Sequence, residues 1–199
     1  MSQNVHNVID LIVMRKILLF AVLLILCLNS SAQSNMGAFW GLELGQNKSQ
    51  VESVLKTKGL TYKWKEVTEK GEIPCQIKGP SIGGIKFHYL TLYFKAGVLT
   101  KGMFHSYDGC GCSLEDWRMH EAGFNSSAMN FQKTFSKVKG ICLLKYGSPI
   151  VDTDTIAEWQ EGTCRISVEY EYELKREPYM ISSWTRVMLT YENVDFSEF

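Results

Sequence analysis

Cysteine and histidine side chains in the middle of the chain have the types and spacing that can hold a metal ion or form disulfide bonds. They are Cys75, His88, His105, Cys110 and Cys112. Imidazole nitrogens and thiolates are common ligands of zinc and copper, and two thiols can instead be oxidised to a disulfide. Which chemistry applies depends on the elements that position these residues.

A tight hairpin between residues 95 and 98 would position the histidines. Gly97 can adopt the positive φ of a two-residue loop, which makes residues 95 and 98 partners. In that register His88 stands directly opposite His105, at about 5 Å. A metal site that combines both with Cys110-Gly-Cys112 is one alternative. The interpretation that we favour is that the histidines end the core face of their strands and that the cysteines are oxidised.

The N-terminal residues 1–32 have the order of a secretory signal peptide. Two cations, Arg15 and Lys16, precede an apolar run over residues 17–28, and small or polar residues follow up to Ala32. The apolar run is shorter than the roughly 20 residues of a membrane-spanning helix. We therefore expect cleavage after Ala32 and an exported, periplasmic or secreted protein, with no membrane span after cleavage.

Export makes a disulfide the expected state of a cysteine. The odd number of cysteines after residue 32 leaves at least one that is free or pairs between chains. We expect Cys75 to bond Cys110 or Cys112. A bond between Cys110 and Cys112 would instead close a small strained ring, which is typical of exchangeable thiol pairs. An extracytoplasmic thiol-redox or metal-binding protein is therefore the alternative function.

The charge balance excludes several classes of partner. Lysine and arginine together number 21, as do aspartate and glutamate, so the formal net charge is zero. A nucleic-acid-binding protein needs a basic face that displaces counterions from phosphates, and binding to an anionic membrane surface needs a polybasic segment. The sequence also contains no nucleophile elbow, phosphate loop or dinucleotide fingerprint. We expect no catalysis, no cofactor and no nucleic-acid partner.

The first half of the chain reads as one helix followed by strands. Asn47 and Gln50 have the spacing of a capping box, which predicts a helix over residues 48–58. Segments rich in strand-forming residues follow, separated by Gly or Pro, at residues 62–68, 72–78, 85–95 and 98–107. The sequence therefore predicts a helix and then an antiparallel meander.

The second half repeats this order. Ser126 or Ser127 is expected to cap a helix that ends at Gly147. Predicted strands follow at residues 156–160, 164–175 and 180–191. Between Cys164 and Leu174, apolar and polar residues alternate, which indicates a strand with one dry and one wet face. Residues 108–125 are expected to connect the halves as a loop or short helical turn.

Aromatic residues of the predicted hairpin form the candidate binding surface. If Leu90, Leu92 and Phe94 face the first helix, four aromatic residues lie on the other face of the sheet. These are Phe87, Tyr89, Tyr93 and Phe104. An open aromatic face usually marks a protein-binding site, whereas the second half or a loop would cover these residues in the alternative.

Two segments resemble a family of bacterial envelope domains. Residues 41–51, Gly-Leu-Glu-Leu-Gly-Gln-Asn-Lys-Ser-Gln-Val, with Leu55 after them, resemble the opening of SmpA and OmlA domains. Residues 144–149, Leu-Lys-Tyr-Gly-Ser-Pro, followed by Trp159, are similar to a segment of related modules. Both modules have the β-lactamase-inhibitor-protein-like fold, in which helices pack on one face of an antiparallel sheet and the unit often occurs twice. The resemblance implies this fold and the binding of proteins.

The sequence thus predicts an α+β protein made of two similar helix-plus-antiparallel-meander halves, with the helices packed on one face of the sheet. The expected segments are a signal peptide at 1–32, of which 1–13 are an upstream over-extension of the reading frame, a first half at 33–107, a connecting loop at 108–125 and a second half at 126–199. The expected function is that of an exported, non-catalytic protein-binding or inhibitory module.

Overall fold

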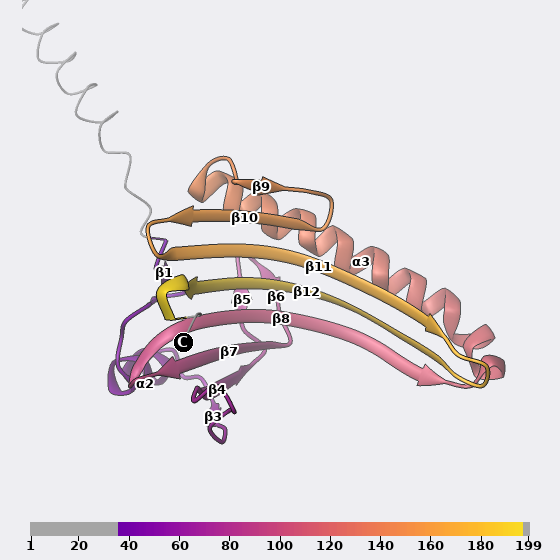
Figure 1. The fold of residues 1–199 in the computed structure, drawn as a ribbon, viewed down its shortest axis with the longest axis horizontal. Coiled ribbons are helices and arrows are strands. Elements are labelled where there is room, and N and C mark those ends of the chain that lie inside the picture. The colour runs from indigo at the N-terminus through magenta and orange to yellow at the C-terminus, as the bar shows by residue number, and fades with distance from the viewer. Residues whose placement is uncertain (1–35, 197–199) are drawn as a thin grey trace, which may run out of the picture. The chain divides into compact units, whose positions relative to one another are not determined.

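An eight-stranded antiparallel sheet organises residues 36–196, the part of the chain that this computed structural model describes (Figure 1). The strand order is β3-β4-β7-β8-β12-β11-β10-β9. Its strands are β3 (Tyr62–Trp64), β4 (Ile73–Lys78), β7 (Tyr89–Lys95), β8 (Val98–Cys112), β9 (Val151–Asp152), β10 (Ile156–Glu161), β11 (Cys164–Arg176) and β12 (Ile181–Asn193). The predicted α+β class with an antiparallel sheet is confirmed, whereas the predicted signal peptide lies outside the described residues.

Two helices and two small hairpins complete the fold. Helix α2 (Lys48–Thr57) precedes the strands β3 to β8, and helix α3 (Leu114–Tyr146) precedes the strands β9 to β12. The small hairpins pair β1 (Ala38–Phe39) with β2 (Leu42–Glu43), and β5 (Ser81–Ile82) with β6 (Ile85–Lys86). A short 3-10 helix, η1 (Val194–Phe196), follows β12. The two runs of strands meet in the middle of the sheet, where β8 pairs with β12 from Cys112 opposite Ile181 to Lys101 opposite Glu192.

Helix α2 begins at the predicted capping box. The Asn47 side chain accepts from the Gln50 backbone N–H at 3.0 Å, and the Gln50 side chain accepts from the Asn47 N–H at 2.9 Å. These bonds satisfy two of the donors that every helix leaves free at its start. Val51 and Leu55 then point into the core. The sequence prediction for this helix is confirmed.

The predicted connecting loop at residues 108–125 is wrong, because strand and helix occupy almost all of it. Strand β8 continues to Cys112, since β12 supplies a pairing partner along that whole length. Helix α3 then begins at once, with Ser113 accepting from the Asp116 backbone N–H at 3.1 Å. The expected cap Ser127 lies inside this helix and donates to Asp108 of β8. None of the helices in the described part of the chain is long and apolar enough to cross a membrane.

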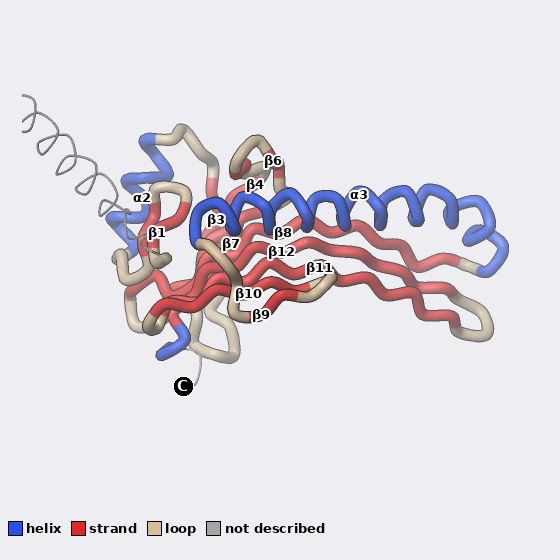
Figure 2. Tube along the Cα trace, turned by 90° about the horizontal axis from the view of Figure 1, so that it is seen from above, coloured by secondary structure: helices blue, strands red, loops and turns tan. Residues whose placement is uncertain are grey.

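Both helices contribute to a core on one face of the sheet. Figure 2 shows α3 running along that face, over the strands β8, β12 and β11. Its buried residues Phe135, Val138 and Cys142 belong to the same apolar cluster as Val51 and Leu55 of α2. A second, smaller cluster lies near the start of α3 and consists of Trp117, Phe124 and Ile181. The opposite face of the sheet carries neither helix.

The turn of the β7–β8 hairpin is the predicted one, but the residues beyond the turn pair in a register that differs from the predicted register. Lys95 pairs with Val98, as expected, and Ala96 and Gly97 both have positive φ. The register then shifts between Phe94 and Tyr93, so that Tyr93 pairs with Lys101. This β-bulge inserts one residue into β8. Every residue of β8 after the bulge therefore faces the side opposite to the one predicted.

Candidate functional site

Three stacked aromatic rings lie on the sheet face that α2 and α3 leave uncovered. Tyr89 of β7 stacks on His105 of β8 with ring centres 5.5 Å apart, and Tyr107 lies 6.5 Å from His105 with nearly parallel rings. Tyr89 alternates along its strand with the buried Leu90, which places it on the opposite side of the sheet from the core. We call Tyr89, His105 and Tyr107 the aromatic cluster. The outer ring, Tyr107, is 54% exposed.

Charged residues of the next strands border the aromatic cluster. Arg186 of β12 stands opposite Tyr107 in register, and on its other side it faces Glu171 of β11. The Arg186 guanidinium donates to Glu171 from Nε at 2.7 Å and lies 5.1 Å from the ring centre of Trp184. The Trp184 indole N–H in turn donates to Glu173. Aromatic rings and a hydrogen-bonded ion pair thus form one continuous surface across the four strands β7, β8, β12 and β11.

The border on β11 is acidic. Glu169, Glu171 and Glu173 alternate along the uncovered face of this strand. Glu171 has Arg186 as its ion partner, whereas Glu169 and Glu173 accept hydrogen bonds from the neutral donors Ser167 and Trp184. A partner for this surface would therefore carry positive charge opposite β11.

Within the aromatic cluster, His105 is the residue whose protonation is disfavoured. Burial lowers the pKa of its imidazole, and the nearby charges of His88 and Arg186 lower it further. The Thr91 hydroxyl lies 3.2 Å from His105 Nε2 and forms a hydrogen bond with it. A neutral imidazole beside two tyrosines, whose own ring centres are 6.4 Å apart, presents an aromatic surface with polar edges, which suits recognition of another protein's side chains.

The structure divides the four predicted binding residues between the two faces. Tyr89 and Tyr93 lie on the uncovered face, and both are partly exposed. Phe87 and Phe104 are buried in the core at 2% and 0% exposure, with ring centres 5.6 Å apart. Phe104 changes side because the bulge shifts the register of β8. Sequence analysis missed Tyr107, Trp184 and Arg186 as surface residues, since only the pairing of β8 with β12 brings them together.

The predicted disulfide of Cys75 with Cys110 or Cys112 is wrong. Cys75 pairs in register with Leu92, which pairs with Gly102. Cys110 lies eight residues farther along β8, roughly 26 Å away at the rise of a strand. No two cysteines of the described chain are at bonding distance, and the Sγ atoms of Cys110 and Cys112 are 3.9 Å apart.

The alternative metal site of His88, His105, Cys110 and Cys112 does not assemble either. His105 pairs with Tyr89 because of the bulge, and the backbone N–H of His88 donates to the Ser106 hydroxyl. Both cysteines lie farther along β8, at the end of the strand. Across residues 36–196, no group of three or more His, Cys, Asp or Glu side chains is arranged to hold a metal ion.

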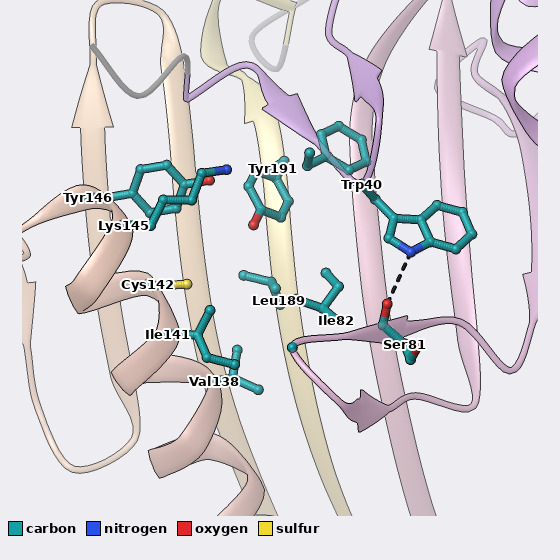
Figure 3. Close-up of a pocket in the computed structure, with 12 residues that line it drawn as sticks. Trp40, Ser81, Ile82, Val138, Ile141, Cys142, Lys145, Tyr146, Leu189 and Tyr191 are labelled. Atoms are coloured by element: carbon teal, nitrogen blue, oxygen red, sulfur yellow. Dashed lines mark hydrogen bonds between the residues drawn. The ribbon is translucent and has the colours of Figure 1, made fainter. Parts of the chain in front are cut away.

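A cavity on the helix-covered face is a second candidate site (Figure 3). It has a volume of about 230 Å³ and lies between the end of α3, the strand β12, and the hairpins β1–β2 and β5–β6. Figure 3 shows Ile141, Lys145 and Tyr146 on one side, Leu189 and Tyr191 behind, and Ile82 and Trp40 on the other side. Sequence analysis identified none of these residues as functional, because four separate segments build the cavity.

Comparison with known proteins adds no further constraint. The chain matches no protein-family model, no curated protein and no solved structure. The resemblance to SmpA and OmlA domains therefore stays a prediction from two short segments.

Proposed function

We propose that this chain is an exported, non-catalytic module that binds another protein through the uncovered face of its sheet. The observation that carries the proposal is the aromatic cluster, which joins the exposed Tyr107 to the pair of Arg186 and Glu171. Exposed aromatic residues beside arginine are typical of the centres of protein interfaces. Export is proposed from the order of residues 1–32.

The partner is a protein surface that presents lysine or arginine next to an apolar or aromatic side chain. The cations would lie over Glu169 and Glu173, whose present hydrogen-bond partners are neutral. The apolar group would stack on Tyr107. Charge complementarity of this kind mainly accelerates association and falls with increasing salt.

We also propose that the two halves descend from one repeated unit of a helix and a four-stranded meander. The support is the element order, in which each of α2 and α3 precedes four strands of the sheet, and the mirrored strand order about the β8–β12 pair. The halves differ mainly in the helix, which has 10 residues in α2 and 33 in α3. Such an arrangement agrees with the fold that the sequence resemblance implies.

Site-specific photocrosslinking tests the binding proposal. A photoreactive phenylalanine analogue at Tyr107 should give one discrete adduct in the producing cells, whereas the same analogue at Tyr179 should give none. Tyr179 is the matched control because it is 90% exposed but lies outside the sheet face, in the turn before β12. After the partner is identified and purified, Tyr107→Ala should weaken its binding by about tenfold or more, as expected for a central aromatic residue.

Stability and salt dependence complete the test. Because Tyr107 is largely exposed, Tyr107→Ala should leave the melting temperature nearly unchanged. Association of the partner should slow as salt increases, and Glu173→Gln should reduce this dependence. Equal partner binding by the wild type and Tyr107→Ala would contradict the proposal.

A thiol-redox role is the second candidate function, and the short distance between two cysteine thiols favours it. The Sγ atoms of Cys110 and Cys112 are 3.9 Å apart, on the same side of β8. Burial, followed by the hydrogen bond with Cys110, raises the pKa of the Cys112 thiol, which disfavours the reactive thiolate. If this pair cycles between two thiols and a disulfide, mild treatment with a disulfide oxidant should join the two residues within one peptide. Non-reducing peptide mapping detects this bond.

A further inference from the structure

The cavity on the helix-covered face has apolar walls and polar groups at one end. Ile82, Ile141 and Leu189 line the apolar part. The phenols of Tyr146 and Tyr191 and the ammonium of Lys145 gather at the other part (Figure 3). Ligand pockets in proteins commonly combine an apolar lining with a few polar groups that orient the ligand.

The Tyr146 hydroxyl is a buried polar group without a partner. Its oxygen is inaccessible to solvent and has no hydrogen bond of good geometry within the described range 36–196, and the group nearest to pairing with it is the Tyr191 phenol, whose pKa it helps to raise. Leaving a buried hydroxyl unpaired reduces stability, and native proteins rarely do so without a reason. A ligand that accepts a hydrogen bond at this position would satisfy the group.

Lys145 provides a cation without a counterion at the same end. Its Nζ lies 4.8 Å from the ring centre of Tyr146 and donates at 3.5 Å to the carbonyl oxygen of Ala38. Within residues 36–196, no carboxylate is close enough to form an ion pair with this ammonium. An anion beside it would gain both a charge interaction and a hydrogen bond.

Two further polar groups of the cavity, Cys142 and Tyr191, are in their neutral forms at neutral pH. Burial raises the pKa of the Cys142 thiol to about 12, so it stays protonated. Burial also raises the pKa of Tyr191, and the neighbouring Tyr146 and Cys142 add to this effect. Both groups remain neutral, so the cavity is suited to reversible binding.

The volume limits the size of the ligand. The cavity of about 230 Å³ is large enough for a small organic molecule. A short carboxylic acid would occupy it, whereas a long acyl chain would have to extend out of its open side.

We propose that this cavity binds a small carboxylic acid with an apolar body. The carboxylate accepts hydrogen bonds from the Tyr146 hydroxyl and the Lys145 ammonium, and the apolar body lies against Ile82, Ile141 and Leu189. This site lies on the opposite side of the sheet from the proposed protein-binding face, so either proposal can fail without the other.

Titration with hexanoate, followed by NMR of the protein backbone, tests this proposal. Hexanoate should shift the amide signals of residues around the cavity in a saturable manner. 1-Hexanol should bind more weakly because it lacks the charge. Lys145→Met should weaken hexanoate binding by about tenfold, the effect of one charge-assisted hydrogen bond. Lys137→Met, an exposed site on the same helix away from the cavity, should have no effect.

A second variant separates ligand binding from folding. Tyr146→Phe removes the unpaired hydroxyl, so the melting temperature of the ligand-free protein should stay the same or rise. The same variant should weaken hexanoate binding several-fold. The absence of saturable shifts with hexanoate, or equal binding by the wild type, Lys145→Met and Tyr146→Phe, would overturn the proposal.

Discussion

The two ends of the long sheet are stabilised in different ways. At the end near the β7–β8 turn, both helices, the small hairpins and seven of the eight strands, all but β9, contribute to one large apolar cluster. At the other end only β8, β12 and β11 continue, and their cluster has three buried residues, Trp117, Phe124 and Ile181. The stability of the protein should therefore reside mainly at the first end, while the second depends on the first half of α3.

The largest effect is expected from a core truncation at the well-packed end. Phe104 is fully buried, and its ring contacts those of Phe39, Trp40 and Phe87. Phe104→Ala should reduce the free energy of unfolding by about 3–5 kcal/mol, through lost burial and the remaining cavity. Urea denaturation measures this loss, and Phe104→Leu should lose much less. A loss below about 1 kcal/mol would show that this end is not the main source of stability.

A smaller and local effect is expected at the other end. Trp117→Ala removes the largest ring of the small cluster, but it also removes an indole N–H that is buried without a partner in the described structure. The two effects oppose each other, so we expect a loss of about 2 kcal/mol. Hydrogen exchange should accelerate in residues 108–125 and 174–182, but not around Leu92. Met119→Ala, on the exposed side of the same helix, is the control.

The alternative outcome for Trp117→Ala is also informative. If amides at both ends exchanged faster by the same factor, the two ends would unfold as one cooperative unit. The two ends of the sheet would then differ in packing but not in stability.

The smallest effect is a pH dependence of stability at His105. The pKa of His105 is lower in the folded protein than the usual unfolded value near 6.5, so the unfolded chain binds the proton more tightly. The contribution of this group is therefore fully present above about pH 6.5 and decreases as the pH falls below that value. His105→Gln should make the stability less sensitive to acid in this range, as measured by urea denaturation at several pH values. His120→Gln on α3 is the control, and equal acid sensitivity in His105→Gln and the wild type would contradict the assignment.

Local sequence signals predicted local structure well. The spacing of Asn47 and Gln50 located the first helix, because a capping box depends only on neighbouring residues. The turn at Ala96 and Gly97 was predicted for a similar reason. The bulge in β8 was not predicted, since no residue type requires it, and a shift of one position exchanged the faces of Phe104 and His105.

The start of α3 was missed because its sequence has a weak apolar stripe. Trp117 and Phe124 are buried, but exposed residues such as Met119 and Gly123 lie between them. The helix packs there on β8, β11 and β12, and the last two of these strands are distant from it in the sequence. Ser113 followed by Glu115 and Asp116 was the available signal, because a capping hydroxyl and early acidic residues favour a helix start.

Of the candidate sites, sequence analysis could predict only the part that lies on one hairpin. Tyr89 and Tyr93 were placed correctly because strand alternation fixes their side of the sheet. Arg186 and Trp184 join them only through the pairing of β8 with β12. The cavity depends on the distance between Tyr146, Ile82 and Leu189, which no local pattern encodes.

The position of β12 between β8 and β11 has a consequence for the folding rate. Its pairs with β8 join residues roughly 70 to 90 positions apart in the sequence, and such distant pairings form slowly. Until β12 inserts, β8 and β11 each expose an unpaired edge that can recruit another chain. The folding protein should therefore be most prone to aggregation before this one strand is in place, and a chaperone that protects these edges would increase the yield of native protein.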